Sequence, residues 1–313
     1  MTSRDVFRSL VATRSAQIGF AILAGFALIA TIGPWFVGDA SDMVGVPMQP
    51  PSWAHWLGTT GQGQDVLAQT VVGAGRSLLI GFVVGVGTVV IGALIGTAAG
   101  YVGGWVDDVL VLVINIFLVM PALPLMVVIA AHVPDPSVWT IAIVMIATGW
   151  AWSARVFRAQ TLSLRDRDFV YAAKVGGESG WRIVVLEIMP NMLPILASAF
   201  IGSTIYAIGA QVGLEYLGLG DVNAVTWGTN LYNAANDVSI YTGSWWTFVP
   251  TGTSIAMVGF GLAMINNAID EIGNPRLRAE DSFVRETARA RVRPGGPTPV
   301  LRRDVDKAGG DKK

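Results

Sequence analysis

Long stretches without charged residues constrain the fold of this chain more than any other feature of its sequence. A helix of about 20 apolar residues is long enough to cross the hydrocarbon core of a membrane. Uncharged stretches near or above that length lie at residues 15–38, 77–106, 109–134, 136–154, 188–214 and 238–269, the last of which starts with polar loop up to about Thr247. Only 14% of the 313 residues are charged, against about 25% in soluble proteins. The sequence therefore predicts an all-α polytopic membrane protein with six transmembrane helices.

The distribution of lysine and arginine predicts how these helices cross the membrane, because short basic loops stay in the cytoplasm. With the N-terminus inside, every Lys and Arg except Arg76 lies on an inner segment. The inner segments are then residues 1–14, 103–108, 155–190 and 271 onward, and the outer loops are 39–76, 132–137 and 215–247. We therefore expect a multi-pass protein of the plasma membrane with both termini in the cytoplasm.

The same boundaries divide the chain into four parts. Residues 1–14 form a cytoplasmic N-terminal segment, and residues 15–76 the first span and first outer loop. Residues 77–278 form the transmembrane core, and 279–313 a cytoplasmic tail whose charged, Pro- and Gly-bearing composition predicts disorder. A cleaved signal peptide also begins with basic residues, but its apolar region is only about 7–15 residues long. We therefore expect the first span to remain uncleaved.

Small residues and prolines indicate how the spans pack. The second uncharged stretch carries glycines four residues apart: Gly81 and Gly85, then Gly92, Gly96, Gly100 and Gly104. Glycines at this spacing lie on one helix face and let two backbones approach closely; general helix packing is sufficient to explain them. Pro121 and Pro124 predict a kink in the third span, where the bent helix either lines a pathway or fits its neighbours.

The most strongly patterned polar segment of the chain is residues 168–190, DFVYAAKVGGESGWRIVVLEIMP. Two helical faces are expected here: Phe169, Ala172, Ala173 and Gly176, then Trp181, Val184, Val185 and Ile188. Gly176 and Gly177 stop the first helix, the Ser179 hydroxyl caps the second, and Pro190 marks its end. We expect a pair of short amphipathic helices; an amphipathic loop in the headgroup region is the alternative.

This segment resembles the EAA loop of permeases from ATP-binding-cassette (ABC) importers. Ala172, Ala173, Gly177 and Pro190 fall on the family pattern, whereas Tyr171 replaces its leading Glu and Met189 its usual Leu. The resemblance implies a coupling helix that docks in a cleft of an ATPase subunit. The docking residues that it implies are Tyr171, Ala172, Ala173, Lys174, Gly176, Gly177, Glu178, Ser179, Trp181 and Pro190.

Two further regions resemble permeases of oligopeptide and dipeptide importers, specifically the type with a short first outer loop. The first region is HWLGT at 55–59, GQDVL at 63–67 and SLLIG at 77–81; here Thr60 and Gln64 depart from the family's Asp and Arg. The second comprises LGLG at 217–220, Trp227, Gly228, Trp245, Trp246, Pro250, Asn266 and NPRLR at 274–278. The family implies a type I ABC importer transmembrane domain in a bacterial inner membrane.

The resemblance also implies the partners of the chain. These are a second homologous permease subunit, two ATP-binding-cassette ATPase subunits, an extracytoplasmic substrate-binding protein and membrane lipid, without nucleic acid. The chain has no G-x-x-x-x-G-K-[ST] run, so ATP and Mg²⁺ are expected on partner subunits, with no cofactor or catalytic residue on this chain. Di- and oligopeptides are the leading substrates; nickel chelates, glutathione and oligosaccharides are the alternatives.

An enzymatic function was weighed against transport. Residues 218–221 spell GLGD, which resembles aspartyl intramembrane proteases, but no Tyr-Asp pair supplies the second carboxylate that this chemistry needs. With no cysteine and only His55 and His132, a thiolate or histidine metal centre is not expected. The predicted spans contain no ionisable residue, which disfavours a proton relay or an ion-coupled transporter. A membrane scaffold or an intramembrane hydrolase without an ATPase partner is therefore the remote alternative.

Overall fold

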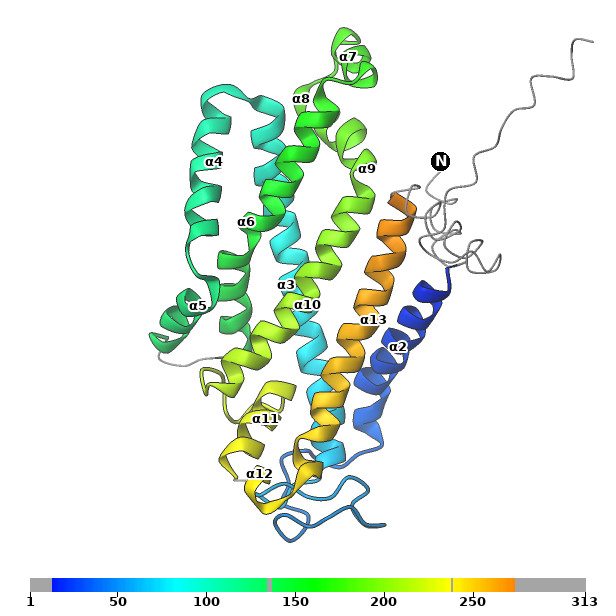
Figure 1. The fold of residues 1–313 in the computed structure, drawn as a ribbon, viewed down its shortest axis with the longest axis vertical. Coiled ribbons are helices and arrows are strands. Elements are labelled where there is room, and N and C mark those ends of the chain that lie inside the picture. The colour runs from blue at the N-terminus through cyan, green and yellow to red at the C-terminus, as the bar shows by residue number, and fades with distance from the viewer. Residues whose placement is uncertain (1–12, 134–136, 238, 274–313) are drawn as a thin grey trace, which may run out of the picture. The chain divides into compact units, whose positions relative to one another are not determined.

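Helices make up most of the chain that this computed structural model describes, residues 13–133, 137–237 and 239–273 (Figure 1). In chain order the elements are α2 (Arg14–Ile32), η1 (Gly33–Trp35), α3 (Val66–Val102), α4 (Gly104–Val119), α5 (Ala122–Ala131), α6 (Val138–Arg165), α7 (Asp168–Val175), α8 (Gly180–Arg182), the π-helix η2 (Ile183–Ile188), α9 (Met189–Asn191), α10 (Leu193–Tyr216), α11 (Trp227–Asn236), α12 (Ser239–Thr242), η3 (Trp245–Thr247) and α13 (Val249–Gly273). Within the described residues, strand-like pairing is limited to isolated bridges in the loop before α3. The all-α prediction is confirmed; the tail at 279–313 and most of segment 1–14 lie outside the described residues.

Five helices in the described residues are long and apolar enough to cross a membrane: α2 with η1, α3, α6, α10 and α13. The sixth predicted span is broken, because α4 and α5 meet at an angle of 81°. Met120, which precedes Pro121, has an extended backbone (ψ 130°), as expected where the proline ring disfavours the helical conformation. The predicted kink is confirmed, and the count of six holds if the bent pair is one span.

The spanning helices extend beyond the uncharged stretches of the sequence. α3 begins at Val66, because the Asp65 side chain accepts hydrogen bonds from the backbone N–H groups of Leu67 and Ala68 and so caps the helix. Arg76 therefore lies within α3 and Glu215 within α10. The prediction that no span contains an ionisable residue is wrong, since it assumed that each helix ends where the charges begin.

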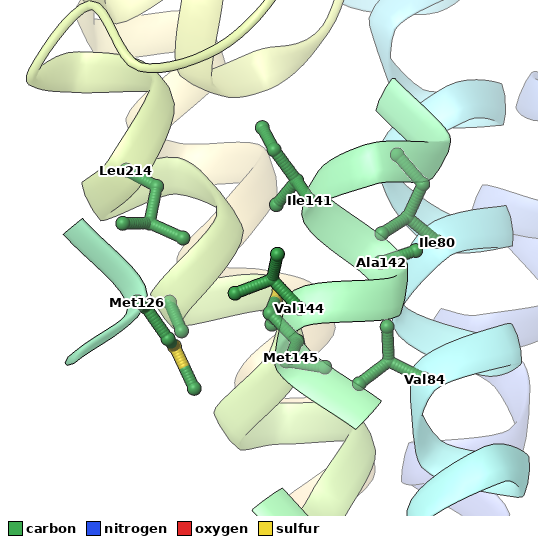
Figure 2. Close-up of a cluster of buried hydrophobic side chains, with 10 residues drawn as sticks. Ile80, Val84, Met126, Ile141, Ala142, Val144, Met145 and Leu214 are labelled. Carbon is green, nitrogen blue, oxygen red and sulfur yellow. The ribbon is translucent and has the colours of Figure 1, made fainter. Parts of the chain in front are cut away.

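The glycines of α3 bring it close to two other helices. A Cβ added at Gly81 would lie 2.5 Å from Ile208 of α10, and one added at Gly96 would lie 2.4 Å from the carbonyl oxygen of Ala154 in α6. Gly104 does not continue the row; it starts α4 and a Cβ there would meet nothing within 4 Å. Figure 2 shows the apolar cluster that fills the space between α3, α5, α6 and α10, and its labelled residues are Ile80, Val84, Met126, Ile141, Ala142, Val144, Met145 and Leu214.

The loops and short helices gather at two opposite ends of the bundle (Figure 1). α7, α8 and α9 lie at the same end as the start of α2, the end of α3 and the end of α13. The loop before α3, together with α11 and α12, lies at the other end. Within the described residues, the connections between successive spans thus alternate between the two ends of the bundle, as the predicted topology requires.

Candidate functional site

The first half of the segment 168–190 is a helix that glycine ends. α7 is followed by Gly176 and then by Gly177, whose φ of +79° is the left-handed conformation that glycine adopts without strain. The backbone N–H of Glu178 donates to the Ala173 carbonyl (3.1 Å), and that of Gly177 donates to the Lys174 carbonyl (3.1 Å). These two bonds form a Schellman motif. The predicted glycine stop is therefore confirmed.

The second half begins at Ser179, but the predicted cap is wrong. Ser179 has the extended backbone of an N-cap residue (φ −70°, ψ 147°), yet its hydroxyl makes no capping hydrogen bond. Its backbone carbonyl instead accepts from the N–H of Ile183 at 3.0 Å. Because Ser179 and Gly180 are exposed, water can satisfy the free N–H groups of this first turn.

The predicted apolar face of the second helix is only partly correct, and the π-helix explains why. As predicted, Ile188 is buried and Val184 packs against the same cluster. Hydrogen bonds in η2 join residues five apart instead of four, so Ile183 and Ile188 share the buried face. Trp181 and Val185, which a 3.6-residue period placed on that face, are exposed. η2 ends two residues before Pro190, which has no N–H and would clash within a regular α-helix. The helix ends at Asn191, one residue beyond the proline.

Buried contacts fix the segment to the spans. Val170, Ile183, Ile188 and Met192 form one cluster with Ala93 of α3 and Phe157 of α6. Phe169 and Ala173 pack against this cluster, whereas Ala172 and Gly176 are exposed. The buried face of α7 is thus rotated from the predicted one: Val170 faces the spans, where we expected Ala172. The two short helices therefore form a hairpin whose inner face is packed on α3 and α6.

The opposite side of this hairpin is a solvent-exposed surface that carries most of the predicted docking residues. We call it the hairpin surface; it comprises Tyr171, Ala172, Lys174, Val175, Gly176, Gly177, Glu178, Ser179 and Trp181. Val175 is 88% and Trp181 68% exposed. Ala173 is half-buried, and Pro190 is exposed but belongs to the other end of the second helix. Large apolar side chains presented together on a rigid element mark an interaction site.

Polar contacts order the hairpin surface. The Lys174 ammonium lies 5.4 Å from the Tyr171 ring centroid and 5.6 Å from that of Tyr101 in α3. The Arg182 Nε donates to Glu178 Oε2 at 2.8 Å. Tyr101 was not among the predicted residues. The sequence signal for it is only an aromatic at the end of a span, which is also typical of a membrane interface.

A second feature that the sequence did not indicate ties α6 to its neighbours beside the hairpin. Arg158 of α6 makes two hydrogen bonds to the Asp107 carboxylate of α4, Nε to Oδ1 at 2.5 Å and Nη2 to Oδ2 at 2.6 Å. Arg165 Nη1 donates to the Gly100 carbonyl of α3 at 2.9 Å. A bidentate pair of this kind fixes orientation as well as distance. Displacement of the end of α6 is therefore linked to α3 and α4.

At the other end of the bundle, the two remaining matched regions contact each other. His55 Nδ1 lies 2.9 Å from Asp65 Oδ2, and Trp246 Nε1 donates to the Thr59 carbonyl at 3.2 Å. The two departures from the family pattern are also neighbours, since the backbone N–H of Gln64 donates to the Thr60 hydroxyl at 3.2 Å. The loop before α3 is thus a folded structure that contacts η3, the short helix before α13.

The sequence GLGD at 218–221 is a turn and not a pair of catalytic carboxylates. Gly218 has a φ of +78°, and Asp221 Oδ1 accepts the backbone N–H of Asn223 at 2.9 Å. The buried carboxylate nearby is Glu215, which is 2% exposed and accepts from Gln211 (3.0 Å) and from the Thr226 hydroxyl (2.6 Å). Glu215 therefore joins the end of α10 to the start of α11. Among the described residues, no group of three or more His, Cys, Asp or Glu side chains is arranged to hold a metal ion.

Together these features define a multi-pass membrane protein with an exposed helical hairpin at one end of its helices and a folded loop assembly at the other. A family model described as "Binding-protein-dependent transport system inner membrane component" matches residues 89–278. The chain belongs to this family of ABC transporter permeases.

Curated relatives agree with the family match. The chain is 38% identical over 174 residues to the oligopeptide transport system permease protein OppC of Mycobacterium tuberculosis. The aligned part covers 55% of this chain and 60% of that protein. It is 31% identical over 280 residues to the dipeptide transport system permease protein DppC of Alkalihalophilus pseudofirmus (88% and 90% covered). It is 29% identical over 281 residues to the DppC protein of Bacillus subtilis (88% and 86% covered).

Proposed function

We propose that this chain is a permease subunit of a bacterial ABC importer for di- and oligopeptides. The peptide substrate is supported by the relatives, which are named for oligopeptide and dipeptide transport and align with up to 88% of this chain. The importer fold is supported by the family match. Nickel chelates, glutathione and oligosaccharides are alternative substrates, and uptake assays with labelled dipeptides against these compounds distinguish them.

The proposed mechanism places the energy source outside this chain. Two ATPase subunits bind ATP and Mg²⁺, close, and push on the hairpin surface and on its counterpart in a second permease subunit. The hairpin passes the displacement to α3 and α6 through the cluster around Val170 and Ile183, and to α4 through the Arg158–Asp107 pair. Coupling of this kind requires two arrangements of the spans that both sites bias. A binding protein delivers the peptide at the opposite end, where the loop before α3 meets α11.

The observation that carries this proposal is that residues 168–190 have one face packed on the spans and one face exposed. Its inner face is buried on the spans, and its outer face presents Val175 and Trp181 to solvent. An amphipathic loop in the headgroup region would not need an ordered glycine turn facing away from the bundle. The basic-loop distribution supports a cytoplasmic position for this end of the molecule, with both termini on the same side.

The substitution Gly177→Asp tests the docking role. A Cβ at Gly177 would meet nothing within 4 Å in the isolated chain, so, apart from the strain of its positive φ, the substitution acts through a partner seated on the turn. We expect membrane insertion to be retained, and both dipeptide uptake and co-purification of the ATPase subunits to be lost. The assay compares uptake by vesicles that contain the whole transporter with the amount of inserted permease.

Gly243→Asp provides a matched control. Gly243 also has a positive φ (+74°) and open space around its Cβ position, but it lies in the loop between α12 and η3. Both variants carry the same backbone strain, about 1–2 kcal/mol for a left-handed non-glycine residue. Normal uptake by inserted Gly177→Asp, or an equal loss in both variants, would contradict docking at this turn.

A further inference from the structure

One arginine of a spanning helix has no acidic partner. Arg155 lies in α6 and is exposed on the surface of the bundle. In the part of the chain that the structure describes, Arg158, Arg165 and Arg182 form ion pairs with carboxylates, whereas Arg155 forms none. An ionisable residue within a span is costly and generally serves a function. Arg155 is therefore a cation for which the described residues supply no counter-charge.

A hydrogen bond to a neutral group holds the Arg155 side chain at the seam between α4 and α6. Its Nη2 donates to Oδ1 of Asn115 in α4 at 3.1 Å. Ile114 and Ala154, which directly precede these two residues in the sequence, are buried in the apolar cluster that joins the helices. The amide oxygen orients the guanidinium without neutralising it, and it leaves most of the N–H donors of the arginine for another acceptor.

The surface around this pair is apolar. Leu112 and Val119 are neighbours of Asn115 on α4 at i−3 and i+4, and they are 60% and 84% exposed. Trp152 lies one turn before Arg155 on α6 and is 66% exposed. Large exposed apolar side chains suit lipid tails, which are as apolar as leucine, better than they suit a water-filled pathway. The guanidinium is thus a charged group within a lipid-facing surface.

The depth of Arg155 in the membrane matches the level of the lipid headgroups. α6 begins at Val138, and Arg155 lies about 26 Å along the helix from there, at 1.5 Å per residue. The hydrocarbon core of a membrane is about 30 Å thick, so a span that enters it at Val138 places Arg155 just inside the opposite boundary. Arg158, one turn nearer the hairpin, is already paired with Asp107. At this depth an arginine keeps its stem in the apolar region and extends its guanidinium to the phosphate level.

A phosphate group supplies the missing counter-charge at this level, because guanidinium and phosphate form strong, charge-assisted hydrogen bonds. Basic groups between spanning helices bind anionic headgroups in this way. We propose that the seam binds the phosphate of one anionic phospholipid from the leaflet at the hairpin end, with Arg155 as the anchor and Asn115 as the residue that positions it. A zwitterionic lipid binds less well, because its own ammonium group neutralises its phosphate. The bound lipid contacts both α4 and α6 and stabilises their pairing.

The test measures thermal unfolding of the purified full chain in detergent micelles that contain either phosphatidylglycerol, which is anionic, or phosphatidylcholine, which is zwitterionic. We expect phosphatidylglycerol to give a Tm roughly 2–4 °C higher, the shift that a ligand at about ten times its Kd produces in a chain of this size. Arg155→Gln should abolish the difference, and Arg76→Gln, at an exposed arginine of α3, should retain it. Equal Tm values with the two lipids would overturn the proposal, as would a phosphatidylglycerol effect that persists in Arg155→Gln.

A second variant separates a built site from general attraction to charge, and it keeps the test decisive if Arg155→Gln folds poorly. Asn115→Leu retains the cation and removes the acceptor that orients it. The concentration of phosphatidylglycerol that gives half of the Tm rise should therefore increase about two- to tenfold, because the free side chain must be immobilised on binding. An unchanged concentration would show that Asn115 does not position the guanidinium for lipid, and would reject the site.

Two other occupants of the seam are distinguished by assays on the whole transporter. If Arg155→Gln retains the lipid effect but no longer prefers dipeptides with a free carboxylate over amidated ones in uptake, Arg155 belongs to the translocation pathway. If it retains the lipid effect but loses the second permease subunit during purification, Arg155 belongs to a subunit contact. Either result overturns the lipid site.

Discussion

Replacement of Gly96 by alanine is expected to separate α3 from α6, the helix that leads into the hairpin. The added Cβ would lie 2.4 Å from the Ala154 carbonyl oxygen, 3.0 Å from the Arg158 backbone nitrogen and 3.0 Å from Phe157 Cβ. Two of these atoms belong to the α6 backbone and cannot rotate away. Ordinary contact begins at 3.4 Å, so the helices must move apart by up to about 1 Å, and a gap of 0.5–1 Å forfeits a quarter to a half of the local dispersion energy.

The expected cost is about 1–3 kcal/mol of unfolding free energy, as for other overpacked interiors. The measurement is the unfolding of the purified chain in detergent, driven either by heat or by denaturant. Gly25→Ala in α2 and Gly209→Ala in α10 are the matched controls, because both are helical glycines with nothing within 4 Å of the Cβ position. They should be neutral or more stable by about 0.5–1 kcal/mol, since alanine favours a helix. Equal stability of Gly96→Ala and these controls would refute the close α3–α6 contact.

Two further predictions concern the hairpin and its link to the spans. Trp181→Ala should change the stability of the chain by only about 0.5 kcal/mol, because Trp181 is mostly exposed. It should nevertheless weaken ATPase binding by about 2 kcal/mol or more, as truncation of an interface tryptophan does. Tyr241→Ala, at a still more exposed aromatic at the other end, should leave binding intact. A double-mutant cycle on Asp107→Asn and Arg158→Met should give a coupling energy of about 1–3 kcal/mol, and a value near zero would remove the proposed link between α4 and α6.

The sequence determined the parts of this fold that depend on local chemistry. The glycine stop after α7 follows from Gly177, because a left-handed residue at that position is what glycine provides. The break before α5 follows from Pro121, which makes the helical conformation unfavourable for Met120. The spans follow from apolar length alone. In each case the deciding residue acts on its immediate neighbours.

The parts that could not be predicted depend on contacts between distant residues or on a departure from the usual period. The Arg158–Asp107 pair joins residues 51 apart in the sequence, and the hydrogen bond from Trp246 to the Thr59 carbonyl joins residues 187 apart. The face of the second helix was misassigned because its phase was counted with the α-helical period. Arg76 was placed outside the spans because the prediction started the second span after this charge, whereas Asp65 caps α3 further upstream. Glu215 was placed outside because the prediction ended the span before this charge, whereas α10 continues to Tyr216.

The π-helix has a consequence for how the hairpin is aimed. A hydrogen-bonded turn that spans five residues holds one residue more than a turn that spans four, and one residue corresponds to about 100° of rotation around an α-helix. Deleting a single residue between Ile183 and Ile188 would restore the ordinary winding and swing Trp181 away from its present direction while the spans stay in place. The angle of the hairpin surface relative to the spans is thus set by the length of one turn. If the proposed ATPase subunit docks there, a permease without that extra residue would need a partner with its contacts placed elsewhere.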